Sequence, residues 1–197
     1  MSEERASLRD LVIHFGDDGS RWREDAQAQT PLIAKVIGLG ERETLSVLYC
    51  WGLDDRVTGM HCARSFAGVP VEAGEVFIDL GMDGRIVEAR SMVAAPIELS
   101  TVVPSLSYEN AERIVRELVA AAELPALQGK SWVLQRIDLQ VFGRGCPARL
   151  VWNGMLAVRP WSAHILLDAH SGEVVTSWLT GCFTRPRWEP FSLLPPG

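Results

Sequence analysis

The segment between residues 104 and 125 is the clearest helix in the sequence, and its pattern limits the folds that the chain can adopt. Apolar residues recur there at helical spacing, and charged residues fall on the opposite side. Ser107 suits the N-cap of such a helix, and Pro125 cannot continue it. A helix with one apolar side has to bury that side against another element. The apolar side consists of Tyr108, Ala111, Ile114, Val115, Leu118, Val119 and Ala122.

Segments with the alternation of β-strands lie before and after this helix. Asp83-Gly84 and Ser171-Gly172 suit tight turns between strands, because glycine adopts the positive φ that such turns require. The sequence therefore predicts an α+β fold of two tandem units, each an antiparallel sheet packed against a helix, with residues 21–39 available for the first helix. The expected strands span 45–51, 60–66, 74–80, 85–92, 132–141, 148–158, 163–168 and 173–179.

Charge and hydropathy argue against two classes of partner. The 197 residues carry a formal net charge of −6, and the arginines are scattered among acidic residues. We therefore expect no nucleic-acid partner, because nucleic-acid binding needs a basic patch. No apolar run reaches the roughly 20 residues of a membrane-spanning helix, so we expect no membrane partner. The first ten residues lack the apolar stretch of a secretory signal, which predicts a cytoplasmic protein, or a secreted one if the N-terminus is incomplete.

Motifs for catalysis or metal binding are missing from the sequence. Cys50, Cys62, Cys146 and Cys182 are spaced too widely for a zinc or redox motif, and we expect buried thiols. The sequence has no His-Glu-x-x-His pair, phosphate loop or nucleophile elbow. We therefore expect no catalytic residue, no metal and no cofactor.

Two groups of residues, whose first residues are 91 positions apart, nevertheless resemble a known family. The first group lies between residues 59 and 75, and the second between residues 150 and 174, after the predicted helix. In this order they resemble the propeptide of thermolysin-like metalloproteases, in which a fungalysin/thermolysin propeptide motif precedes a PepSY domain. The matching positions include Gly59, His61, Arg64, Gly68, Pro70, Val71, Gly74, Glu75, Trp152, Asp168 and Gly172.

The resemblance covers residues 57–178 and implies cystatin-like subdomains. It divides the chain into an N-terminal extension with a helix in residues 1–40, a fungalysin/thermolysin propeptide-like unit over 41–103, a PepSY-like unit over 104–183 and a proline-rich tail over 184–197. The tail should have little structure of its own. The chain departs from the family at Ser65-Phe66 and Cys62-Ala63, and it holds no protease domain.

Candidate binding residues come from the first motif and from the tail. His61 and Arg64 are three residues apart on a predicted strand, so they should point to opposite faces. Arg64 is a candidate contact for a partner, but the interpretation that we prefer is that it pairs with a nearby acidic side chain or covers the sheet with its stem. Trp188 and Phe191 in the tail either pack back on a sheet or anchor a partner.

The hairpin of the second motif has two interpretations. His164, Asp168 and His170 could supply three metal ligands. The interpretation that we prefer is that Asp168 accepts hydrogen bonds from the amides of the following turn.

The sequence thus predicts a non-catalytic module that binds a protein. The resemblance implies an inhibitor or folding chaperone that acts in trans on a metalloprotease domain. The alternative is a small-molecule-binding protein, or an enzyme of specialised metabolism, with a pocket lined by some of the seven tryptophans. A third hypothesis is an assembly partner with a self-complementary apolar patch.

Overall fold

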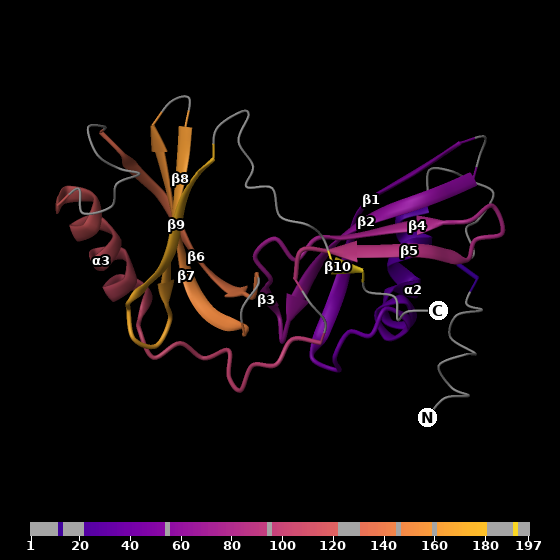
Figure 1. The fold of residues 1–197 in the computed structure, drawn as a ribbon, viewed down its shortest axis with the longest axis horizontal. Coiled ribbons are helices and arrows are strands. Elements are labelled where there is room, and N and C mark those ends of the chain that lie inside the picture. The colour runs from indigo at the N-terminus through magenta and orange to yellow at the C-terminus, as the bar shows by residue number, and fades with distance from the viewer. Residues whose placement is uncertain are drawn as a thin grey trace. The chain divides into compact units, whose positions relative to one another are not determined.

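The chain folds into two compact units of mixed α+β structure, as the sequence predicts (Figure 1). In the computed structural model, the described residues are 12–13, 22–53, 56–93, 96–121, 131–144, 147–158, 161–180 and 191–192. Unit 1 is drawn from Met1–Glu98, Gly143–Pro147 and Glu189–Gly197, and unit 2 from Leu99–Phe142 and Ala148–Trp188. None of the described helices is long and apolar enough to cross a membrane.

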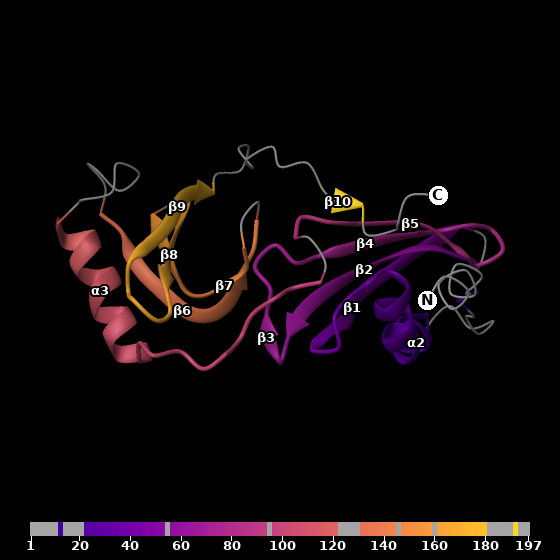
Figure 2. The ribbon, with the colours of Figure 1, turned by 60° about the horizontal axis from the view of Figure 1, so that its bottom comes forward.

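Unit 1 is an antiparallel sheet with helix α2 on one face (Figure 2). Among the described residues the strand order is β1-β2-β4-β5-β10, and the short β3 also pairs with β2. Apolar residues of α2, including Ile33, pack against inward-facing strand residues such as Met60 and Ile78. The elements are α2 (Trp22–Val36), β1 (Glu43–Leu53), β2 (Arg56–Phe66), β3 (Val69–Pro70), β4 (Val76–Leu80), β5 (Ile86–Ser91) and β10 (Phe191–Ser192).

Helix α2 tolerates a proline in its interior because a side chain replaces the missing hydrogen bond. Pro31 has no N–H to donate to the carbonyl of Gln27. The hydroxyl of Thr30 donates to that carbonyl instead, at 2.8 Å. Residues 1–40 were expected as an extension, and α2 within them is part of the core of unit 1, because Ala26 and Ile33 are fully buried there.

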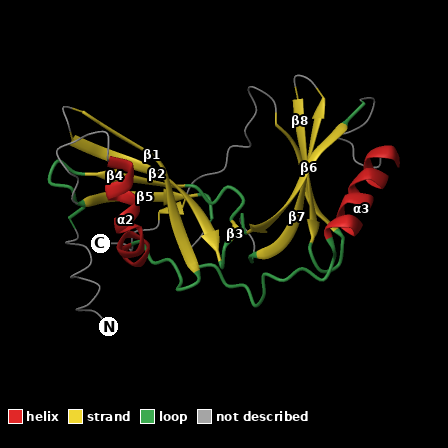
Figure 3. Cartoon of the chain, turned by 180° about the vertical axis from the view of Figure 1, so that it is seen from behind, coloured by secondary structure: helices red, strands yellow, loops and turns green. Residues whose placement is uncertain are grey.

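Unit 2 is a four-stranded antiparallel meander in the order β6-β7-β8-β9, with helix α3 on one face (Figure 3). The helix approaches the sheet closely at Gly154, where an added methyl group would lie 3.0 Å from a methyl carbon of Val115. The indole of Trp152 donates to the carbonyl of Leu106 at 2.9 Å and fixes the segment that leads into α3. The elements are α3 (Tyr108–Ala121), β6 (Val133–Phe142), β7 (Arg149–Val158), β8 (Trp161–Asp168) and β9 (Val174–Thr180).

The expected elements agree with the observed ones apart from their ends and from the tail. The helix predicted from Tyr108 begins at that residue, and the eight expected strands correspond to β1, β2, β4, β5, β6, β7, β8 and β9. The tail was expected to have little structure, whereas Phe191–Ser192 forms a two-residue strand on β5. The expected domain boundaries remain a prediction.

Candidate functional site: the open face of the unit 1 sheet

The face of the unit 1 sheet opposite α2 carries two rows of side chains in register. In the first row Tyr49, His61, Phe77 and Arg90 lie directly opposite one another on β1, β2, β4 and β5. In the second row Trp51, Gly59, Asp79 and Glu88 do the same. Cross-strand neighbours point to one face, and the residues on either side of them point to the α2 face. The rows therefore place an aromatic half on β1, β2 and β4 beside a charged half on β4 and β5.

The aromatic half is a set of touching rings, which we call the aromatic face: Tyr49, Trp51, His61 and Phe77. The imidazole of His61 stacks on Phe77 with centroids 4.3 Å apart and planes 6° apart, and Tyr49 meets its edge at 5.0 Å. Tyr49 in turn contacts Trp51 at 5.8 Å. Tyr49 is 51% exposed and Phe77 is 38% exposed. Large aromatic side chains with this exposure, grouped on one sheet face, are typical of protein contact surfaces.

Gly59 leaves space for the indole of Trp51. A methyl group at Gly59 would lie 2.3 Å from the ring carbon Cζ2 of Trp51, far inside van der Waals contact. The indole therefore lies directly against the backbone of β2 at Gly59. The close approach of the indole explains why this motif position is a glycine. The sequence alone does not supply that reason.

His61 has no hydrogen-bond partner among the described residues. Both ring nitrogens are covered by surrounding atoms, and neither has a partner. Burial lowers the pKa of His61, and the negative charge of Glu75 opposes this effect only in part. The ring is therefore held neutral among its aromatic neighbours, with one donor and one acceptor unused.

The charged half of the open face is an ion-pair cluster centred on Arg90. Its guanidinium donates to Asp79 at 2.8 Å and lies 3.6 Å from Glu88. All three side chains are partly exposed, so the pairs themselves contribute little to stability. The cluster ends the aromatic face on the β5 side with a charged border.

Arg64 points away from the open face, and its guanidinium is fully buried. It forms an ion pair with Glu43, donates to Oε1 of that residue at 2.6 Å and donates to the carbonyl of Val93 at 2.8 Å. The other carboxylate oxygen accepts from the amides of Gly40 at 2.7 Å and Ile97 at 3.0 Å. Burial lowers the pKa of Arg64, and the charge and hydrogen bond of Glu43 oppose this effect only in part. Arg64, the candidate partner contact, is thus occupied inside unit 1, and the structure confirms the preferred interpretation that it pairs with an acidic side chain.

Two further motif positions, Gly68 and Gly74, shape the connection after β2. Ala67 and Gly68 both have positive φ, and they turn the chain so that Val69 and Pro70 pair back on the end of β2. Gly74 lies against Val71, where a methyl group would be 2.5 Å from the side chain. These motif residues build the loop and do not contribute polar groups to the open face.

In unit 2 the second motif forms the turn that was expected. Asp168 accepts hydrogen bonds from the amides of His170 at 2.9 Å and Ser171 at 3.0 Å. Partial burial raises the pKa of Asp168, but these amides and the charges of His170 and Arg149 together outweigh it, and the net shift is downward. Gly172 completes the turn with a φ of 79°. Among the described residues, no three His, Cys, Asp or Glu side chains are arranged to hold a metal ion.

A polar row crosses the face of the unit 2 sheet that points away from α3. The side-chain amide of Asn153 donates to Gln140 at 3.0 Å, and its oxygen lies 3.1 Å from Nδ1 of His164. The imidazole of His164 stacks on Trp178 with centroids 4.9 Å apart. Asn153 is only 5% exposed, whereas Gln140 and His164 are half-buried.

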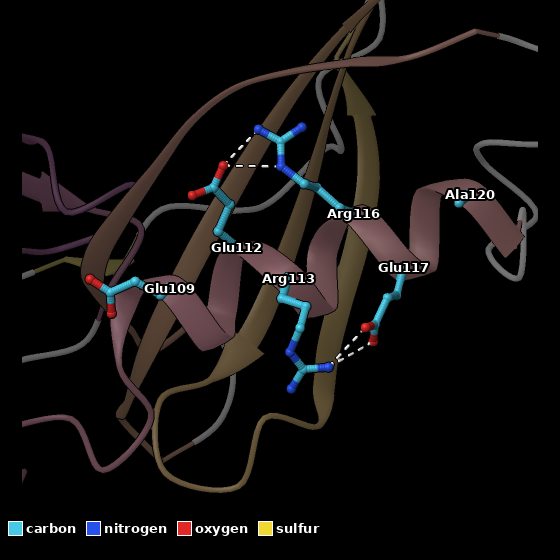
Figure 4. Close-up of a pocket in the computed structure, with 6 residues that line it drawn as sticks. All are labelled: Glu109, Glu112, Arg113, Arg116, Glu117 and Ala120. Atoms are coloured by element: carbon cyan, nitrogen blue, oxygen red, sulfur yellow. Dashed lines mark hydrogen bonds and ion pairs between the residues drawn. The ribbon is translucent and has the colours of Figure 1, made fainter.

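A shallow hollow on the outer side of α3 is the helix surface itself (Figure 4). Arg113 pairs with Glu117 at 2.8 Å and Arg116 with Glu112 at 2.6 Å, each one helical turn apart. Exposed pairs of this kind contribute about 0.3–0.5 kcal/mol each. The hollow is therefore the space between these paired, solvent-exposed side chains, and we assign no functional site to it.

The structure describes only some of the remaining candidate residues. Trp188 lies outside the described residues, and Phe191 lies in β10, opposite Ser91. Cys62 is buried, and burial raises the pKa of its thiol to about 12, which makes it unreactive. Cys50 is also a free thiol, whereas Cys146 and Cys182 lie outside the described residues.

Comparisons with known proteins do not assign a family. The sequence matches no protein-family model and no curated protein. Among solved structures, the Bacillus megaterium YpeB C-terminal domain is similar to 86% of this chain over 69% of its own length, with 12% sequence identity and a TM-score of 0.37. A likeness this remote carries no functional information, so the propeptide resemblance remains a prediction from the sequence motifs.

Proposed function

We propose that this chain is a non-catalytic module that binds another protein through the aromatic face of unit 1. The observation that carries the proposal is the set of touching rings of Tyr49, Trp51, His61 and Phe77 on the sheet face that α2 does not cover. Aromatic residues are enriched among the residues that dominate binding energy at protein interfaces.

The motifs suggest which kind of partner to test first. Their resemblance to thermolysin-like propeptides implies a metalloprotease domain, for which the chain would act in trans as an inhibitor or folding chaperone. Such a role needs a preformed surface and no reactive group. A stable complex would bury on the order of 1,600 Å² in total, so contacts beyond the aromatic face would have to contribute.

The test measures inhibition and refolding of a thermolysin-like protease by the full chain. Tyr49→Ala combined with Phe77→Ala should weaken inhibition by roughly 30-fold or more, because truncation of a central interface aromatic costs about 2 kcal/mol or more. Met82→Ala is the matched control, since Met82 is 72% exposed in a turn of the same unit and outside the aromatic face. A chain that lacks residues 184–197 tests whether the tail contributes.

Two outcomes would contradict the proposal. If the aromatic variant and the Met82→Ala variant inhibit equally, the aromatic face is not the contact surface. If the chain neither inhibits such proteases nor changes their refolding yield, the metalloprotease is not the partner.

The polar row of unit 2 supports a second candidate function, the binding of a small molecule. A few placed polar groups among aromatic side chains are a common way to orient a small ligand. Here Asn153 joins Gln140 and His164, and Trp178 covers the imidazole. A ligand that raises the melting temperature of the chain, and no longer does so for Asn153→Leu, would favour this function. If ligand-induced shifts are equal in Asn153→Leu and the unaltered chain, the row is structural.

A further inference from the structure

A carboxylate that has no ion pair among the described residues lies beside the aromatic face. Glu75, Phe77 and Asp79 alternate along β4 and the residue before it, so their side chains point to the same face. Burial lowers the pKa of His61 and the negative charge of Glu75 opposes this effect, which places the carboxylate close to the imidazole. Glu75 is exposed, so its charge is available to a partner.

The charged half of the open face adds to this negative charge. Arg90 is the one cation in the two rows, and Asp79 and Glu88 share it. Together with Glu75, the face therefore has three carboxylates and one guanidinium, a net charge of −2. The aromatic face thus has acidic side chains beside Phe77 in both directions along β4.

These groups disfavour two kinds of occupant. An apolar surface that covered Phe77 would take water away from Glu75 and Asp79 and offer no partner in exchange, which is costly for a carboxylate. An acidic surface would meet like charge and be repelled. The occupant whose charge complements this face is therefore a basic one.

A basic side chain fits both the rings and the carboxylate. Residues two apart on a strand are about 7 Å from each other, so Glu75 lies within reach of a side chain whose stem packs on Phe77. Lysine and arginine combine an aliphatic stem with a charged head. Arginine suits the site better, because its planar guanidinium also stacks on aromatic rings and pairs with a carboxylate through two hydrogen bonds.

We propose that the aromatic face binds a basic segment of the partner protein, in which an arginine packs its stem on Phe77 and pairs its guanidinium with Glu75. The inference rests on the proposed function, because it uses the same surface and adds the chemical class of the partner. It does not depend on the partner being a protease. The negative charge of the face should also steer such a segment toward the rings, so association should slow as salt is added.

The first experiment selects peptides from a random heptapeptide library displayed on phage, with the full chain as the target. Peptides that also bind the variant with Tyr49→Ala and Phe77→Ala are removed. The remaining peptides should contain arginine or lysine several-fold more often than the library does. The library contains acidic and apolar side chains as well, so a preference for either of them is equally detectable.

The second experiment measures the affinity of the most enriched peptide in two versions, one with arginine and one with citrulline, which keeps the shape of arginine and removes its charge. Glu75→Gln should weaken binding of the arginine peptide by about 10-fold and leave binding of the citrulline peptide unchanged. Glu24→Gln is the matched control, because Glu24 is exposed on α2, which covers the other face of the sheet. The association rate of the arginine peptide should fall as the salt concentration rises.

Four results would overturn the inference: selection of peptides without basic residues, selection of none, equal affinity for the two versions of the peptide, or equal effects of Glu75→Gln and Glu24→Gln. An affinity that rises about 10-fold or more when residues 184–197 are removed would also overturn it, because Arg185 or Arg187 of this chain would then be the occupant. A concentration-dependent dimer that Glu75→Gln abolishes would do the same, because a second copy would then be the occupant.

The outcomes also separate this inference from the proposed function. Neutral peptides that need Tyr49 and Phe77, or protease inhibition that needs these rings and not Glu75, would reject the basic segment and leave the proposed surface intact. Capture of basic peptides without protease inhibition would reject only the protease as partner. If neither peptides nor proteases distinguish the aromatic variant from the unaltered chain, the proposed function itself is wrong.

Discussion

The buried pair of Arg64 and Glu43 gives the sharpest test of what holds unit 1 together. Both side chains are completely buried, so removal of one partner leaves an uncompensated charge in the core. We expect Arg64→Met alone to lower the free energy of unfolding by about 3–5 kcal/mol. Glu43→Leu should cost at least as much, because it also leaves the amides of Gly40 and Ile97 without an acceptor.

The double variant should be less destabilised than the two single variants combined. It leaves no buried charge, but the amides of Gly40 and Ile97 and the carbonyl of Val93 still lose their partners. Three unpaired backbone groups cost about 1–3 kcal/mol each before relaxation, so the double variant stays below the unaltered chain. The coupling free energy of the cycle should therefore exceed about 2 kcal/mol.

The assay is urea unfolding at pH 7, monitored by hydrogen exchange. Exchange at individual amides separates the unfolding transition of unit 1 from that of unit 2. A cycle on Arg113 and Glu117 is the matched control, because that pair is exposed on α3 and should show a coupling of no more than about 0.5 kcal/mol. Additive effects at Arg64 and Glu43, or single variants within about 1 kcal/mol of the unaltered chain, would refute the reasoning.

Three other predictions concern the same unit. Gly59→Ala should destabilise it by about 1–3 kcal/mol and shift the indole N–H signal of Trp51 in NMR spectra, because the new methyl group meets the ring; an unchanged signal would contradict this. Ala67→Gly should stabilise the unit by about 0.5–1 kcal/mol in urea titrations, because Ala67 has a φ of 48°, a left-handed conformation that glycine adopts without strain. The matched variant Ala63→Gly, in the extended strand β2, should destabilise the unit by a similar amount. Burial lowers the pKa of His61, so the unfolded state binds a proton at this residue more readily than the folded state does. Stability should therefore fall as the pH drops below the ordinary value of 6.5 toward the folded pKa. Thermal unfolding of His61→Gln should show a smaller loss of stability over this pH range, and an equal loss would assign the effect to other groups.

The candidate site was only partly predictable from the sequence. The placement of His61 and Arg64 on opposite faces followed from strand alternation, and the structure confirms it. Phe77 carried a usable signal, because it alternates with Glu75 and Asp79 on the polar side of its strand, where a solvated face would not need an aromatic residue. Tyr49 carried none, because a β-bulge between Val47 and Tyr49 shifts the register, and strand pattern alone does not locate a bulge.

The partners of buried polar groups were beyond the reach of the sequence. Glu43 and Arg64 are 21 residues apart, and the amide of Ile97 that completes their site is 54 residues from Glu43. Nothing local specifies such a meeting, since it depends on how strands and loops close over the core. The polar row of Gln140, Asn153 and His164 is similar, because its members come from three strands.

The sequence by itself determined the elements and the α+β class, because helical and strand periodicity and glycine turns act over a few residues. The tertiary structure decided what those elements do. It turned Arg64 inward to Glu43, gathered the rings of Tyr49, Trp51, His61 and Phe77 on one face, and placed β10 on the edge of β5. The physical reason is that burial, cross-strand register and edge pairing depend on contacts between residues far apart in the chain, which no local pattern encodes.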